Sequence, residues 1–225
     1  MDDDEPGVEP PLDAGDFASW SQAATAAIAG DRSADVPCGT CTACCTASQF
    51  VHVGPDEHDT LAHIPAELQF PAPRLPRGHV VLGYDERGRC PMLVGDACSI
   101  YEHRPRTCRT YDCRVFAAAD VAVDDDKPLI ARRAVRWRFT HLTPADRAEH
   151  DAVRAAARYL EERGETLDDV IAPVNATQRA VVALEIHDVF LGRDPETDAV
   201  TVVEPGAAAV RAAVLRLASY PGAMP

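Results

Sequence analysis

The run Cys38-Gly39-Thr40-Cys41-Thr42-Ala43-Cys44-Cys45 places four thiols within eight consecutive residues. Four more cysteines follow downstream, and the rest of the 225-residue chain contains none. These later cysteines are Cys90, Cys98, Cys108 and Cys113. Cysteines that serve only to fill a core would be scattered along the chain. Their collection between positions 38 and 113 therefore predicts a shared task, and we expect that task to be metal binding by all eight thiols.

The spacing Cys38-x2-Cys41-x2-Cys44 indicates which metals to expect. It brings three thiols together in one short segment, as in the iron–sulfur ligation of bacterial ferredoxins, where the fourth cysteine comes from elsewhere. Structural zinc sites more often combine one Cys-x2-Cys pair with a second pair. The spacing favours an iron–sulfur cluster or iron as the cofactor, with zinc as the alternative.

Cys44 and Cys45 are adjacent, and adjacent side chains diverge in most backbone conformations. They are therefore not expected to bind the same mononuclear ion. Two four-thiolate sites, or one site with additional thiols, remain alternatives. The sequence does not assign each cysteine to a centre.

Arginines alternate with the later thiols, at Arg104, Arg106 and Arg109. Thiolate-bound metal centres are anionic, so nearby guanidinium groups would offset their charge. We expect these three arginines to surround the bound cofactor without ligating it. A solvated helix face that carries arginines is the simpler alternative.

The net charge of −14 is concentrated at one end, because residues 1–16 carry seven acidic side chains and no basic one. This composition predicts a disordered acidic tail at residues 1–15. The acidity of the whole chain argues against nucleic-acid binding and against anionic membrane surfaces. The sequence contains no apolar run of membrane-spanning length and no apolar leader, so a cytoplasmic location is expected, where thiols stay reduced.

Periodicity predicts an α+β fold that is mostly α-helical. A small cysteine-cluster domain with a β-hairpin would cover residues 16–116, including an N-terminal helix, and a helical region would cover 117–225. The hairpin would pair 79–84 with 89–94 and place Cys90 on its second strand. Elsewhere we expect helices at 17–28, 56–64, 145–163, 166–172, 175–191 and 207–218, a strand or short helix at 130–139, a strand at 199–203, and a helix after Pro105 that ends or distorts near Asp112.

The cysteine pattern resembles a known family. The match comprises the eight cysteines with the pairs Ile100-Tyr101, Arg104-Pro105 and Cys108-Arg109. Over about residues 36–116 it resembles the CxxCxxCC family of zinc- or iron-chelating domains, the YkgJ-like cysteine cluster proteins. The resemblance implies metal chelation and no settled reaction. A related arrangement occurs in flagellin lysine N-methylases, where it is linked to an iron–sulfur cluster and methyl transfer.

The leading hypothesis is a metal-binding cysteine-cluster protein of unassigned reaction, whose partner is the metal ion or cluster itself. One alternative is an enzyme of redox or methyl-transfer type that uses the cluster. Another is a zinc-stapled module that binds a protein partner through its C-terminal helices. Three histidines, His52, His58 and His63, are expected to be solvated or packed rather than to bind metal. The arginines of 132–138 are expected to form salt bridges, within the body or with the acidic tail.

Overall fold

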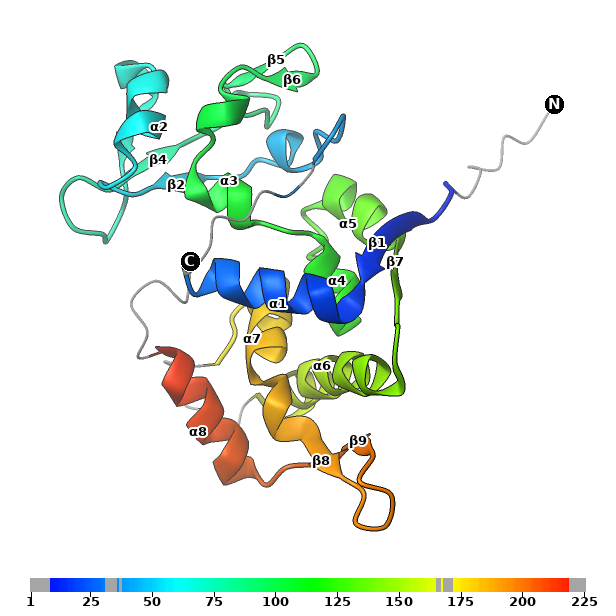
Figure 1. Ribbon diagram of the computed structural model, residues 1–225. Coiled ribbons are helices and arrows are strands. Elements are labelled where there is room, and N and C mark those ends of the chain that lie inside the picture. Colours follow the sequence, from blue (N-terminus) through cyan, green and yellow to red (C-terminus); the bar gives the residue numbers. More distant parts are fainter. Residues whose placement is uncertain (1–8, 31–35, 37, 165–166, 168–171, 219–225) are drawn as a thin grey trace.

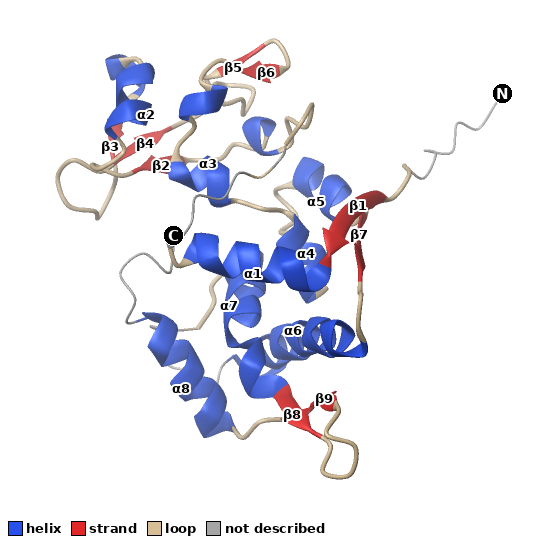
Figure 2. Ribbon diagram, in the orientation of Figure 1, coloured by secondary structure: helices blue, strands red, loops and turns tan. Residues whose placement is uncertain are grey.

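A computed structural model of the chain describes residues 9–30, 36, 38–164, 167 and 172–218. It confirms an α+β fold that is mostly helical, with small β-sheets (Figure 1). The C-terminal helices and the helix Phe17–Ile28 form one half of the molecule, and the cysteine-rich segment with its short strands forms the other (Figure 2). Each half has its own hydrophobic core.

The larger core lies among the helices α1 (Phe17–Ile28), α4 (Arg114–Ala119), α6 (Pro144–Arg163), α7 (Ala176–Ile186) and α8 (Ala207–Ala218). Many of its buried residues are alanines, which allow the helices to approach closely. Phe17 is fully buried there, and its ring stacks on His150 with ring centroids 4.2 Å apart. Burial of a side chain of this size contributes about 1.5–3 kcal/mol to stability.

Side-chain caps fix the starts of three of these helices. Asp16 accepts from the backbone N–H of Ser19 at 2.9 Å, and Asn175 accepts from that of Gln178 at 2.8 Å. Thr143 and Asp146 form a reciprocal capping box. A 3-10 helix, His187–Phe190, extends α7, and the hairpin β8 (Leu191–Arg193) and β9 (Val200–Val202) leads to α8. The predicted helix at 166–172 falls largely outside the described residues.

The smaller core lies in the cysteine-rich half, beneath a three-stranded antiparallel sheet. The sheet has the order β2 (Val51–Val53), β4 (Val80–Leu82), β3 (Phe70–Pro71). The core contains Val53, Ile64 and Leu82, each at most 3% exposed. Around it lie α2 (His58–His63), the 3-10 helices Ala66–Leu68 and Tyr101–His103, and the hairpin of β5 (Leu93–Val94) and β6 (Ala97–Cys98).

The predicted hairpin of 79–84 with 89–94 is wrong. Strand β4 pairs with β2 and β3 instead, and Cys90 lies in a turn that precedes β5. The reason is long-range pairing: β2 supplies Val51 and Val53, whose buried side chains join the core on the same side as Leu82. Only Leu93 and Val94 of the expected second strand lie in a hairpin, the small one in which they pair with Cys98 and Ala97.

The acidic N-terminal segment is partly ordered, which corrects the prediction of disorder for residues 12–15. Strand β1 (Leu12–Asp16) pairs in parallel with β7 (Trp137–Thr140). Glu9 accepts from Arg132 at 2.6 Å and also from Arg136, which confirms the expected pairing of these arginines with acidic residues of the tail. Segment 130–139 divides between helix α5 (Pro128–Ala134) and β7. Residues 1–8 lie outside the described part.

The two halves meet where the chain passes from α3 (Arg106–Thr110) to α4. Helix α3 ends before Asp112, as expected, and Cys113 is the N-terminal cap residue of α4. Asp112 is nearly buried and accepts from Trp20 at 2.8 Å and from Arg114 at 2.6 Å. The bond from Trp20 attaches the α3–α4 junction to α1, and the bond from Arg114 lies within the junction.

Helix α1 packs with α6 and α7, so its side chains belong to the larger core. The division at residue 116 into a cysteine domain and a helical region stays a prediction. None of the helices in the described residues combines the length and the apolar composition that a membrane crossing requires.

Candidate metal centre

The eight cysteines come from six segments of the chain and line one cavity. Cys38 and Cys41 lie in the turn before the 3-10 helix Cys44–Thr46, which carries the next two thiols. Cys90 lies in a turn, and the other three are at the end of β6, within α3 and at the start of α4. The cavity has a volume of about 380 Å³, and all eight cysteines are among its lining residues. No disulfide joins them, and each is half-buried.

The thiols form two sets around this cavity. Cys44 and Cys113 pack against the larger core, whereas Cys90, Cys98 and Cys108 pack against the smaller one. Cys45, which directly follows Cys44, is not among the thiols packed against either core. Cys38 and Cys41 raise the pKa of both Cys44 and Cys45, and they rank ahead of Cys45 among the thiols that act on Cys44 but behind Cys90 and Cys98 among those that act on Cys45.

The first set contains Cys44, Cys113, Cys38 and Cys41. Burial raises the pKa of the Cys44 thiol, and the neighbouring thiols that raise it further are Cys113, Cys38 and Cys41, ahead of Cys45. Burial also raises the pKa of Cys113 to about 11. The indole N–H of Trp137 donates to the Cys113 sulfur at 3.2 Å and partly offsets this rise.

The second set contains Cys45, Cys90, Cys98 and Cys108. Burial raises the pKa of Cys45 to about 11, and the thiols with the largest further effect are Cys90 and Cys98. Burial raises the pKa of Cys108 to about 12, with Cys90, Cys45 and Cys98 as the next contributors. The backbone N–H of Cys90 donates to the carbonyl of Cys45 at 2.7 Å, and this bond attaches the turn to the 3-10 helix.

The three predicted arginines lie in different environments. Arg104 lines the cavity, is only 6% exposed, and lowers the pKa of Cys108 through its charge. Its guanidinium lies 3.5 Å from the centre of the Tyr101 ring. Arg106 is exposed and points to Asp56 at 2.5 Å, and neither it nor the half-buried Arg109 is among the cavity-lining residues.

Sequence reasoning missed the cavity residues Arg133, Trp137 and Tyr111. Arg133 lies 5.0 Å from the Trp137 ring, and its charge lowers the pKa of Cys113. Tyr111 is half-buried beside the first set, and burial followed by the charges of Cys44 and Cys113 raises its pKa. The sequence could have indicated Tyr111, because this residue lies between Cys108 and Cys113. Arg133 and Trp137 lie beyond the cysteine pattern, so only the tertiary structure identifies them.

The thiols are spread around the cavity, and their sulfur atoms do not converge on a single point. Among the described residues, Asp59, His63 and His103 are the one group of three or more whose possible ligand atoms all lie within 4.8 Å of each other. Four thiolates on one ion, with bonds of about 2.3 Å, would lie about 3.8 Å apart. A single ion would therefore require the thiols of a set to move inwards. The donor set itself, eight thiols and no disulfide, suits zinc, iron and iron–sulfur clusters.

Searches of curated proteins and of solved structures found no match to this chain. A family match does exist, and it covers all eight thiols and α3, α4 and the start of α5. Residues 37–129 match the CxxCxxCC family, described as a "putative zinc- or iron-chelating domain", and this confirms the resemblance drawn from the cysteine pattern.

Proposed function

We propose that this protein binds iron through its eight cysteines, as an iron–sulfur cluster or as iron ions, with zinc as the alternative. The observation that carries the proposal is that all eight thiols, from six segments of the chain, line one cavity. If the cysteines only filled a core, there would be no reason for all eight to lie at one place. Metal ligation explains both the collection and the absence of disulfides.

We further propose two centres. One would be held by Cys38, Cys41, Cys44 and Cys113, and the other by Cys45, Cys90, Cys98 and Cys108. The division between the two cores and the order of electrostatic neighbours support this assignment. It also gives Cys44 and Cys45 different centres, as the divergence of adjacent side chains requires.

Two features favour iron–sulfur over a mononuclear ion. The first set contains the Cys-x2-Cys-x2-Cys spacing together with one distant cysteine, Cys113. The thiols are also spread around a cavity of about 380 Å³, which leaves space for a centre of several atoms. Such a centre would supply electron transfer or Lewis acidity when bound.

The residues around the cavity would affect the charge balance of such a centre and the protonation of its ligands. A divalent ion with four thiolates carries a net charge of about −2. Arg104 beside the second set and Arg133 beside the first would offset this charge. The raised pKa values of Cys45, Cys108 and Cys113 mean that binding releases protons, because the ligand is the thiolate.

A redox or methyl-transfer enzyme is the second candidate, and the composition of the cavity favours it. Beyond the thiols, the wall includes apolar side chains such as Val51, Leu82 and Met92 and the ring of Tyr101. A centre with an apolar wall beside it has a surface on which a substrate could bind. Reversible reduction by dithionite, followed by electron paramagnetic resonance, tests this candidate. An enzyme of redox type would show a reducible centre, and an inert centre would argue for a structural role.

Anaerobic purification followed by metal and acid-labile sulfide analysis tests the proposal. We expect stoichiometric iron with sulfide and visible absorption. A colourless protein with stoichiometric zinc would favour the structural alternative, in which the C-terminal helices bind a protein partner. A chain without bound metal would overturn the proposal. The cytoplasmic location stays a prediction.

A further inference from the structure

A second group of potential metal ligands lies outside the cysteine cavity. Asp59 and His63 are on α2, one helical turn apart, and His103 ends the 3-10 helix Tyr101–His103. None of the three lines the cavity. All three side chains are accessible to solvent, with 72%, 42% and 36% of their surfaces exposed, respectively.

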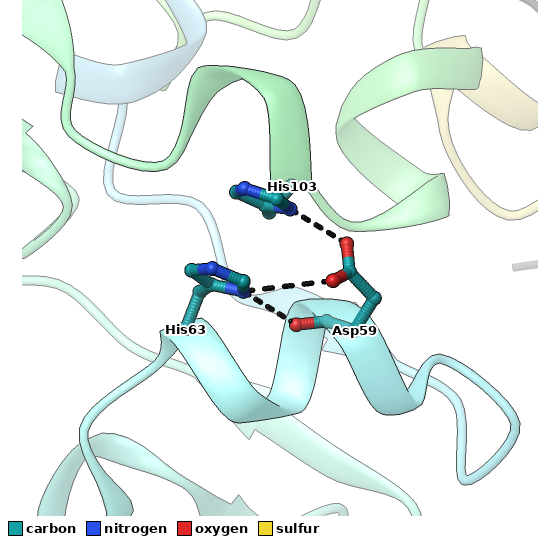
Figure 3. Close-up of side chains that lie close together, drawn as sticks. All are labelled: Asp59, His63 and His103. Atoms are coloured by element: carbon teal, nitrogen blue, oxygen red, sulfur yellow. Dashed lines mark hydrogen bonds and ion pairs between the residues drawn. The ribbon is translucent and has the colours of Figure 1, made fainter.

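The two imidazole rings lie face to face, with their centroids 3.5 Å apart and an angle of 6° between their planes. Figure 3 shows that one nitrogen of each ring points to the same side, towards Asp59. Nδ1 of His103 lies 2.6 Å from Oδ2 of Asp59. Nδ1 of His63 lies 3.8 Å from Oδ1 of Asp59 and 2.8 Å from its backbone oxygen.

These distances are close to those of a metal site. With zinc bonds of 2.0–2.2 Å to nitrogen and oxygen, the ligand atoms of a tetrahedral site lie about 3.4 Å apart. The two nitrogen–carboxylate distances, 2.6 Å and 3.8 Å, lie on either side of this value. Small rotations of the side chains would suffice for all three to bind one ion.

We propose that Asp59, His63 and His103 form a second metal site, which takes a divalent transition metal ion such as Zn²⁺. Two imidazoles and one carboxylate select this class over Mg²⁺ and Ca²⁺, which prefer oxygen ligands. Because the group is exposed, water completes the coordination. The ion takes the place of the proton between His103 and Asp59. This proposal is independent of the function proposed for the cysteines.

A purely structural role explains the group less well. The start of α2 is already attached to α3 by two other contacts. Asp56 accepts from the Arg106 guanidinium, and Glu57, which is buried, accepts from the Arg106 backbone N–H, both at 2.5 Å. His103 lies three residues before Arg106, so the two parallel rings and the carboxylate add to contacts that already hold this segment of the chain against the start of α2.

Equilibrium dialysis of the purified protein against micromolar Zn²⁺ tests the site, with metal counted before and after. We expect one additional Zn²⁺ per chain in the wild type. His63→Gln and His103→Gln should lose it or bind it at least about tenfold more weakly. His58→Gln is the matched control, because His58 is an exposed histidine of the same helix outside the group, and it should keep the ion.

The amount of zinc that enters empty cysteine sites should be equal in the wild type and in the three histidine variants. A failure of this proposal can therefore be told apart from a failure of the function proposed for the cysteines. The proposal of a second site is overturned if dialysis adds no zinc to the wild type beyond the amount that the cysteines bind. It is equally overturned if His63→Gln and His103→Gln bind as much zinc as His58→Gln.

Discussion

The assignment of thiols to two centres predicts that single cysteine variants remove half of the metal. Cys108 belongs to the set beside the smaller core, and Cys113 belongs to the set beside the larger one. Cys108→Ser removes one of four thiolates from one centre and none from the other. Cys113→Ser does the same for the opposite centre.

The expected magnitude follows from the equal size of the sets. Each centre has four ligands, so the loss of one thiolate should abolish or strongly reduce metal binding at that centre. A serine hydroxyl is a poor replacement for a thiolate. The metal content of each single variant should fall to about half of the wild-type value, and that of the double variant to near zero. Removal of either centre should also lower the thermal stability, because metal binding couples to folding.

The assay is metal analysis of anaerobically purified variants, with visible spectra recorded in parallel. Met92→Leu is the control, since Met92 lines the same cavity, supplies no thiolate and has nearly the volume of leucine. It should retain the full metal content. The assignment is refuted if Cys108→Ser or Cys113→Ser alone abolishes all metal binding, or if either variant retains the wild-type amount.

Three further substitutions probe the surroundings of the centres and the larger core. Trp137→Phe removes the N–H that donates to Cys113 at 3.2 Å, and metal competition should show roughly tenfold or more weaker binding. Burial raises the pKa of Glu185 to about 7, so its stability contribution is present below pH 4.5 and lost as the pH rises through 7. Glu185→Gln should therefore stabilise the protein at pH 8 by about 1–2 kcal/mol in urea denaturation, with little effect at pH 5. Asp112→Asn removes the charge paired with Arg114 and should cost about 2 kcal/mol in the same assay.

Each of these expectations has a contrary result. Unchanged metal affinity in Trp137→Phe would mean that the N–H donor does not act on the centre. An equal effect of Glu185→Gln at pH 5 and pH 8 would mean that ionisation of the carboxyl group is not its cause. Full stability of Asp112→Asn would mean that the junction of α3 and α4 does not depend on this charge.

Local signals in the sequence predict most of the helical half. The caps Asp16, Thr143 and Asn175 begin their helices at or next to the expected residue, because a side-chain acceptor for the first backbone N–H groups is a short-range feature. The last helix, 207–218, has the expected bounds for a similar reason, since its apolar residues recur with helical periodicity. The collection of thiols is also a local pattern, and it predicts the family match.

Pairing between distant segments is what the sequence could not predict. Strand β4 pairs with β2, some 30 residues away, and β1 pairs with β7 across more than 120 residues. Such pairs depend on which strands share a core, and periodicity within one segment contains no information about that. The division of the thiols has the same origin, because it depends on the two cores. His63 is exposed, in line with the expectation for this histidine, but the sequence could not predict that its ring stacks on that of His103, 40 residues away.

X-ray absorption at the edge of the bound metal identifies the atoms that bind it, and so tests whether the eight cysteines are the ligands. We expect a nearest shell of sulfur neighbours, at about 2.3 Å if the metal is zinc, with four sulfurs for each metal atom. A nearest shell of nitrogen and oxygen at about 2.0–2.2 Å would contradict the claim that the eight cysteines hold the metal.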